Sequence, residues 1–174
     1  AEFLNNPAFL GADEIVAGEY CRQKIGPGGL FIGDGLQMAQ APYGVMWHKN
    51  EAYGAIRYIN IFFEKIGNVY NMEDSEKKLW TAELKALKAH FYFELMRRYG
   101  PIILVPENID PNASLDEMKQ PRRPIDEVVN AIVDLCDEAI EDLPYLKEKP
   151  STRITYHSKE SAATLKAMTL LYAA

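Results

Sequence analysis

The chain has 174 residues, of which 48% are hydrophobic and 25% are charged, and its formal net charge is −6. This length and composition are typical of one globular domain with a sizeable core. The acidic balance disfavours binding to nucleic acid or to an anionic membrane surface, and no apolar run approaches the roughly 20 residues that a membrane-spanning helix needs.

Residues 26–46 are rich in glycine and proline, and we expect them to form a loop. The spacing of Gly28 and Gly33 imitates the start of a phosphate-binding loop. Asp34 stands where such a loop needs lysine, and its carboxylate would repel a phosphate. We therefore reject a phosphate site here.

Helical periodicity begins after this loop, and residues 47–174 are expected to form a helical scaffold. The first helix is predicted within residues 47–67, because apolar side chains recur there at helical spacing. These side chains are Ile56, Ile59, Phe63 and Ile66. The break before the next helix lies at residues 71–75, which are expected to supply its N-cap.

The central helix is predicted to run from about Ser75 to Gly100, and a strand-like segment follows at residues 102–105. The apolar residues of this helix form two adjoining stripes. The first stripe is Leu79, Ala82, Ala86, Ala89, Phe93 and Met96, and the second stripe is Trp80, Leu84, Leu87, Phe91 and Leu95. A helix of this kind is covered on more than one side, so we expect it to be the inner member of a helical stack. Phe91 is predicted to be a core residue.

Residues 125–143 show the cleanest amphipathic pattern, with Pro124 at the start and Leu135 and Cys136 predicted in the core. The opposite face carries five carboxylates, which are Glu127, Asp134, Asp137, Glu138 and Glu141. No histidine joins them, so we expect a solvated face rather than a metal or acid–base site. Ser158 is predicted to cap the last helix.

No catalytic or metal-binding pattern is visible. There is no nucleophile elbow or paired-carboxylate motif, and the two cysteines lack CxxC spacing. The histidines lie on separate segments, at His48, His90 and His157. Asp110, Asn112 and Ser114 resemble the opening of a calcium loop, but Leu115 and Pro121 replace the glycine and glutamate that it requires. The residues alone therefore predict an all-α, tetratricopeptide-like scaffold with irregular loops, and no enzyme, cofactor or metal site.

Four groups of residues form a further, longer pattern. The first group is Trp47, Tyr53, Ile56 and Asn60. The second group is Glu83, Leu87, Lys88 and Ala89, followed by His90 to Phe93, Leu95 and Tyr99-Gly100. The third group is Arg123, Glu127, Ile132, Asp134, Leu135, Ala139, Leu143 and Pro144, and the fourth group is Arg153, Lys159, Ala162-Ala163, Leu165-Lys166-Ala167 and Leu171-Tyr172. In this order and at these intervals, they resemble the SusD/RagB-like outer-membrane nutrient-binding lipoproteins of Bacteroidetes-type bacteria. Lys88 and Met168 depart from that pattern, in which arginine is usual.

This resemblance implies a non-catalytic cell-surface protein that captures a glycan, less often a peptide, and delivers it to a SusC-like TonB-dependent transporter. It also implies attachment to the outer membrane by a lipid anchor that is not present in this chain. Residues 1–174 would correspond to the N-terminal portion of a SusD-like domain, with the C-terminal part of the family absent.

The matched motifs are expected to be scaffold residues and do not identify a ligand site. The loop before the first helix offers aromatic and polar side chains suited to a sugar, which are Tyr43, Trp47, His48 and Asn50. For Trp47 a place in the core is the preferred interpretation, because it also fits the structural position of the family motif. A second functional class also stays open, a helical-repeat scaffold for protein–protein interaction with no small-ligand site.

Overall fold

The computed structural model describes residues 18–20, 23, 30–36, 38–40 and 51–174. The chain divides into two units, residues 1–46 and residues 47–174. In the first unit, the described residues include the helical turn α3 (Leu30–Gly33), within the segment predicted to be a loop. The rest of that predicted loop lies mostly outside the described residues.

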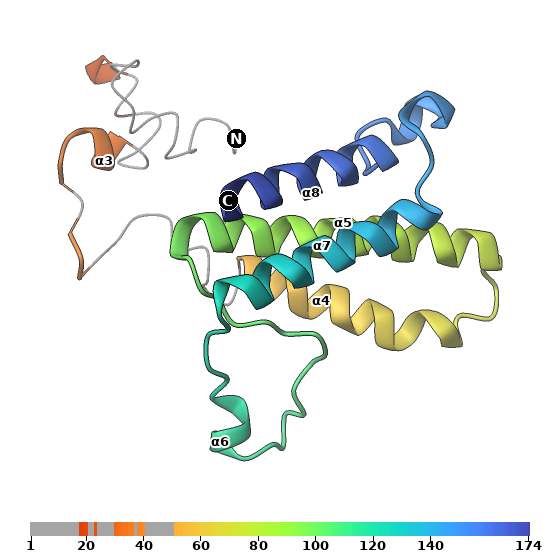
Figure 1. Cartoon of the computed structure of the whole chain (residues 1–174), viewed down its shortest axis with the longest axis horizontal. Coiled ribbons are helices and arrows are strands. Elements are labelled where there is room, and N and C mark those ends of the chain that lie inside the picture. The colour runs from red at the N-terminus through yellow and green to blue at the C-terminus, as the bar shows by residue number, and fades with distance from the viewer. Residues whose placement is uncertain (1–17, 21–22, 24–29, 37, 41–50) are drawn as a thin grey trace. The chain divides into compact units, whose positions relative to one another are not determined.

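Helices make up most of the second unit (Figure 1). The α-helices are α4 (Ala52–Lys65), α5 (Asp74–Tyr99), α6 (Leu115–Met118), α7 (Ile125–Asp142) and α8 (Lys159–Ala173), and the 3₁₀-helices are η2 (Ile66–Asn68), η3 (Leu146–Glu148) and η4 (Ser151–Arg153). Residues 51–174 contain no β-strand. The prediction of an all-α scaffold is therefore confirmed.

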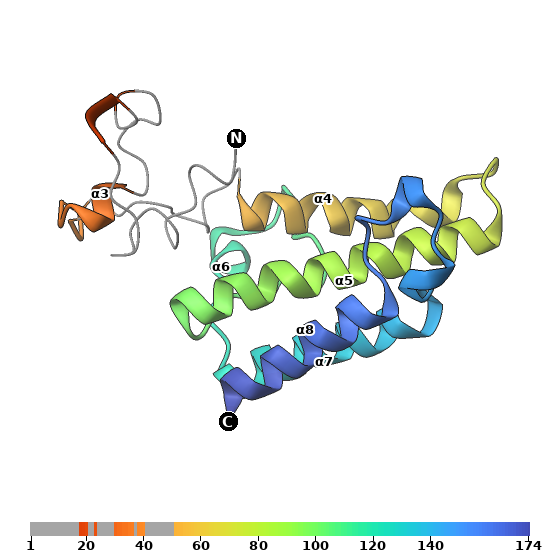
Figure 2. The ribbon, with the colours of Figure 1, turned by 90° about the horizontal axis from the view of Figure 1, so that it is seen from above.

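The long helix α5 lies between α4 on one side and the pair α7 and α8 on the other (Figure 2). Small side chains allow close approach where α5, α7 and α8 meet, in a buried cluster of Ala82, Ala86, Ala139, Leu143 and Ala162. The prediction that α5 is the inner helix of the stack is therefore confirmed.

The two apolar stripes of α5 differ in burial. Most of the first stripe forms core, since Ala82, Ala86, Ala89, Phe93 and Met96 are buried and only Leu79 is partly buried. In the second stripe, Leu95 is fully buried, but Trp80 is 38% exposed and Leu84, Leu87 and Phe91 are only partly buried. The prediction that Phe91 is a buried core residue is therefore wrong.

Leu135 on α7 is also only partly buried, which contradicts its predicted place in the core. It lines a shallow hollow beside Lys85 and Glu138, whose side chains form an ion pair at 2.7 Å. Cys136, the next residue, is fully buried as predicted. The apolar stripes of both helices are thus wider than the interfaces that cover them.

Helix ends follow the sequence closely. Glu73 is the N-cap of α5, which begins at Asp74, one residue before the predicted start. Gly100 ends α5 with a positive φ of 68° and donates its backbone N–H to Met96 O over 2.8 Å, a conformation that favours glycine. Ser158 caps α8 as predicted, and its hydroxyl accepts the backbone N–H of Ser161.

The acidic face of α7 is exposed, as predicted for a solvated face. Two of its carboxylates also pair with neighbouring helices, since Asp137 lies 2.7 Å from Lys166 of α8 and Glu138 reaches Lys85 of α5. Among the described residues, no group of histidine, cysteine and acidic side chains is arranged to hold a metal ion.

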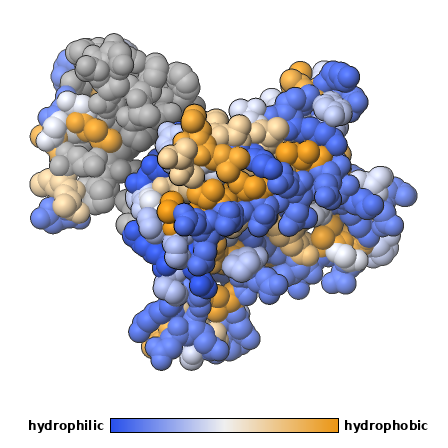
Figure 3. All heavy atoms as spheres, in the orientation of Figure 1, coloured by the Kyte–Doolittle hydropathy of each residue, from blue (hydrophilic) through white to orange (hydrophobic). Residues whose placement is uncertain are grey.

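One side of α8 leaves apolar side chains on the surface, visible as orange atoms in Figure 3. Its exposed large side chains are Met168, Leu170, Leu171 and Tyr172. Tyr172 also lies edge-on to the buried ring of Phe93, with 5.5 Å between the ring centroids. No described element covers the rest of this apolar surface.

Candidate functional site

Residues 102–105 are extended, but they pair with side chains rather than with another strand. The Tyr53 hydroxyl donates to Ile103 O over 3.0 Å and accepts the Ile103 N–H over 3.1 Å. The Tyr92 hydroxyl accepts the Val105 N–H over 2.9 Å. Side chains of α4 and α5 thus satisfy the backbone groups that a neighbouring strand would otherwise bond. Residues 102–105 are therefore extended as predicted, but they do not form a β-strand.

A buried lysine completes this attachment. Lys88 on α5 is 4% exposed, and its ammonium donates to Asn60 Oδ1 over 2.6 Å and to Pro106 O over 2.9 Å. Asn60 in turn donates to Val105 O over 3.1 Å. Burial lowers the pKa of Lys88 to about 8, while Glu107 acts in the opposite direction.

These contacts give a structural role to the residues that carry the sequence motifs. Tyr53, Asn60 and Lys88 fix the chain that leaves α5 against α4, and their polar atoms are used in doing so. Burial raises the pKa of Tyr53 and Tyr92, which keeps both hydroxyls protonated as donors or acceptors. These side chains therefore belong to the scaffold and offer little to a ligand.

Beyond this segment, residues 107–123 form a projecting loop that contains α6 (Figure 1). Asp110 accepts the backbone N–H of Asn112 over 2.8 Å, and Ser114 caps α6 in a reciprocal arrangement with Glu117. The three residues that resemble a calcium loop thus form a turn and a helix cap.

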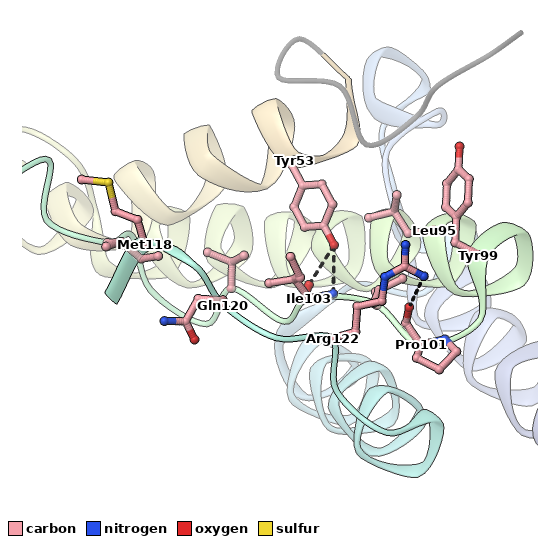
Figure 4. Close-up of a pocket in the computed structure, with 11 residues that line it drawn as sticks. Tyr53, Leu95, Tyr99, Pro101, Ile103, Met118, Gln120 and Arg122 are labelled. Carbon is pink, nitrogen blue, oxygen red and sulfur yellow. Dashed lines mark hydrogen bonds between the residues drawn. The ribbon is translucent and has the colours of Figure 1, made fainter. Parts of the chain in front are cut away.

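A first hollow of about 390 Å³ lies under this loop, between α4 and the end of α5 (Figure 4). Its lining is mainly apolar, with Ile102, Ile109 and Met118 among its residues. The Tyr53 hydroxyl points to Ile103, and Arg122 extends toward Pro101 O at 3.5 Å (Figure 4). This hollow presents few polar groups that a sugar could bind.

A second hollow of about 590 Å³ has a different character, and we call it the Trp80 hollow. It is lined by Phe62, Trp80, Glu83, Leu84, Leu87, Arg153, Thr155, Tyr156 and His157. These residues come from α4, from the first half of α5 and from the segment at and after η4. Aromatic rings and hydrogen-bonding groups share one concave surface, the combination typical of small-ligand sites.

An ion pair forms one wall of the Trp80 hollow. Arg153 Nη2 lies 2.6 Å from Glu83 Oε2, and Glu83 is 8% exposed. The Arg153 guanidinium also lies 4.3 Å from the centroid of the Tyr156 ring. The hydrogen bond that Arg153 donates to the Glu83 carboxylate raises the pKa of Arg153, so the guanidinium stays charged. Glu83 Oε1 is buried and accepts no hydrogen bond from the described residues.

The predicted site residues Tyr43, Trp47, His48 and Asn50 lie outside the described residues, so their role stays a prediction. Sequence reasoning missed the Trp80 hollow, because Trp80 lies in an apolar stripe of the central helix and Arg153 stood out only as a motif residue. One signal was present: the residues one turn before and after Glu83 are all apolar, and a carboxylate in such surroundings needs a cationic partner. These residues are Leu79, Trp80, Ala86 and Leu87.

A family profile for SusD-like proteins, described as "Starch-binding associating with outer membrane", matches residues 30–170. The chain belongs to the SusD-like family. This confirms the resemblance drawn from the four groups of motif residues. No curated protein sequence matches the chain. In the described part of this SusD-like chain, no helix is both long enough and apolar enough to cross a membrane.

Solved structures of SusD-like proteins share the fold. A SusD-like protein from Bacteroides fragilis is 32% identical with a TM-score of 0.64, over 71% of this chain and 23% of that protein. A laminarin-binding SusD-like protein is 27% identical with a TM-score of 0.65, over 74% of this chain and 26% of that protein. Surface glycan-binding protein A from Bacteroides uniformis is 18% identical with a TM-score of 0.65, over 76% of this chain and 28% of that protein. At this identity the match supports the fold alone. The SusD-like chain described here thus spans about a quarter of these structures.

Proposed function

We propose that this chain is part of a cell-surface protein that binds a nutrient glycan without cleaving it and passes it to a SusC-like TonB-dependent transporter. The observation that carries the proposal is membership of a family described by starch binding and association with the outer membrane. The laminarin-binding relative supports a glycan over a peptide as the ligand. A lipid anchor is the expected attachment to the outer membrane.

The domain assignment is part of the same proposal. Residues 1–174 are the N-terminal portion of a SusD-like domain, in which residues 47–174 form the helical scaffold. The share of the relatives' length that the chain spans supports this assignment. The scaffold holds its loops firmly, since side chains from two helices bond the extended segment after α5. A platform of this kind suits a binding protein, because rigid elements position the loops that contact a ligand.

Affinity electrophoresis tests glycan binding, with laminarin, soluble starch or polygalacturonate embedded in the native gel. We expect retardation by at least one polysaccharide, whereas mobility unchanged in every gel would contradict glycan binding by this chain. Handover requires a second experiment, in which the lipoprotein is cross-linked in outer membranes and its neighbours are identified by mass spectrometry. Absence of a TonB-dependent transporter among them would contradict that step.

The alternative function is a helical-repeat scaffold that binds a protein partner and no small ligand. The observation in its favour is the exposed apolar side of α8, which includes Leu171 at 76% exposure. A scaffold of this kind would show no retardation by any polysaccharide. The same gels therefore separate the two functions.

A further inference from the structure

Two partly exposed aromatic rings from distant parts of the chain line the Trp80 hollow. Trp80 on α5 is 38% exposed, and Tyr156 after η4 is 50% exposed. Among the described residues, neither the Trp80 indole N–H nor the Tyr156 hydroxyl has a hydrogen-bond partner. A flat apolar ring with an unused polar tip is suited to a sugar, since the ring stacks on C–H groups while the tip bonds a hydroxyl.

Arg153 adds hydrogen-bond donors at the same surface. Its guanidinium uses one nitrogen on Glu83 and lies over the Tyr156 ring, and 29% of its side chain remains exposed. A guanidinium has five N–H donors in a rigid fork, so donors remain for a ligand. Glu83, which is almost wholly buried, holds the fork in place. Glu83 Oε1 is buried and accepts no hydrogen bond from the described residues, so one acceptor in this wall is unused.

The charges of the hollow point to an uncharged ligand. Glu83 and Arg153 are the acidic and basic residues of its lining, and they neutralise each other at 2.6 Å. Burial, His90 and Lys149 lower the pKa of His157, which keeps this side chain neutral at neutral pH. An acidic sugar would compete with Glu83 for Arg153 and leave a buried carboxylate without its partner, which is unfavourable.

We propose that the Trp80 hollow is a subsite for one ring of an uncharged glycan, with Trp80 and Tyr156 as stacking faces and Arg153 as a hydrogen-bond donor positioned by Glu83. This inference rests on the proposed glycan-binding function and names the part of the chain that performs it. The volume of about 590 Å³ falls within the roughly 300 to 1,000 Å³ of small-ligand pockets.

The test is an NMR titration of the ¹⁵N-labelled chain with laminarihexaose and maltohexaose as neutral probes and an oligogalacturonide of similar length as the acidic probe. The chain has two tryptophans, so the Trp80 indole signal is assigned by its loss in Trp80→Phe. We expect one neutral probe to shift this signal and the acidic probe to leave it unchanged. Trp80→Ala and Tyr156→Ala should each weaken binding about three- to tenfold.

Trp80→Phe retains an aromatic face and should bind more tightly than Trp80→Ala. Tyr70→Ala is the matched control, because Tyr70 is 95% exposed and lies outside the hollow, and it should bind like the unmodified chain. Circular dichroism of each variant establishes that it is folded. If Trp80→Ala is unfolded, Tyr156→Ala in the exposed segment after η4 carries the test.

The outcomes separate this inference from the proposed function. If a neutral probe shifts other signals but not that of Trp80, glycan binding stands and this subsite is overturned. If no glycan shifts any signal, both are overturned for this chain. An oligogalacturonide that shifts the Trp80 signal at least as strongly as the neutral probes would overturn the preference for an uncharged ligand.

Discussion

The Lys88 ammonium lies 2.6 Å from Asn60 Oδ1, and this buried hydrogen bond joins α5 to α4. Asn60 is 2% exposed and also donates to Val105 O, so one side chain links both helices to the extended segment. The Lys88 ammonium contacts neutral oxygens and lies 5.9 Å from the ring centroids of both Phe63 and Tyr92. Because a buried charge is costly unless it is bonded, the stability of the folded chain depends on each of these contacts to the Lys88 ammonium.

Asn60→Ala should therefore lower the free energy of unfolding by roughly 2 to 4 kcal/mol, because it removes a bond to a charged group and a bond to a backbone carbonyl. The matched control is Asn130→Ala, since Asn130 is exposed and also lies within a helix. Both substitutions replace asparagine by alanine, which has the higher helix propensity, but Asn130→Ala removes no buried contact. Urea denaturation followed by circular dichroism measures both, and equal stabilities would show that the Asn60 bonds contribute nothing.

Stability should rise with pH above about pH 8 because of Lys88. Its pKa is about 8 in the folded chain, against an ordinary value of 10.5. Between these values the unfolded chain binds more protons than the folded chain, so the free energy of unfolding increases with pH. Below pH 8 the lysine is charged in both states, and the cost of burying the charge is fully present.

Lys88→Arg tests this dependence, because the guanidinium does not lose its proton in this range. Urea denaturation from pH 7 to pH 9.5 should show a rise for the unmodified chain and a flatter curve for the variant. The range stops below pH 10 because of Tyr53 and Tyr92, whose pKa values are raised in the folded chain. Above that pH these tyrosines ionise in the unfolded chain before they ionise in the folded chain, which lowers the free energy of unfolding. Parallel curves for the two proteins would assign the dependence to other groups.

Two phenylalanines on α5 should differ in their contribution to stability. Phe93 is 1% exposed, whereas Phe91 is only partly buried. Phe93→Ala should cost about 3 to 5 kcal/mol, since it opens a cavity in the core, and Phe91→Ala should cost clearly less. Thermal and urea unfolding of both variants measure the difference, and the reverse order would mean that the burial of the two stripes is assigned wrongly.

This pair also shows how far the sequence predicts the fold. Periodicity located the long helices α4, α5, α7 and α8, because a helix needs an apolar face of fixed spacing, and residue type identified the cap at Ser158. It did not reveal which stripe of α5 meets a neighbouring helix, since both stripes contain large apolar residues. Trp80 and Phe91 follow the same spacing as buried residues, yet they lie where α5 is only partly covered.

The extended segment and the Trp80 hollow depend on contacts between distant residues. An apolar run such as residues 102–105 predicts extension, but Tyr53, which bonds it, lies 50 residues earlier. Glu83 and Arg153 are 70 residues apart, so a carboxylate among apolar neighbours signals a cationic partner but does not reveal which one. Such contacts follow from the packing of α5 against α4 and against the connector after α7, which local patterns do not encode.

The Cys136 thiol should resist chemical modification in the folded chain. It is fully buried, and burial raises its pKa to about 11, so very little reactive thiolate exists at pH 8. Reaction with Ellman's reagent, using Cys21→Ser to remove the other cysteine, should be slow in buffer and complete in denaturant. Rapid stoichiometric reaction of the folded Cys21→Ser chain would mean that the face of α7 around Cys136 opens readily.

The last prediction is that the chain binds an oligosaccharide weakly and leaves it intact. Glycosidic bond hydrolysis generally requires two carboxyl groups, about 5 to 9.5 Å apart, on either side of the bond. Glu83 supplies the carboxylate among the residues that line the Trp80 hollow, and the described residues of that lining contain no second carboxyl group to complete such a pair. One hollow with two stacking rings also contacts only a small part of a flexible glycan, so ordering the glycan offsets much of the contact energy.

Prolonged incubation with laminarihexaose or maltohexaose should therefore yield no new reducing ends, and calorimetric titration should give weak binding. The chromatographic profile of each oligosaccharide should match that of a sample without protein. Glu83→Gln serves as the control for any trace activity, because a contaminating hydrolase would persist in that preparation. Cleavage that scales with protein concentration and disappears in Glu83→Gln would show that the hollow is catalytic, and it would replace the binding function proposed for the chain.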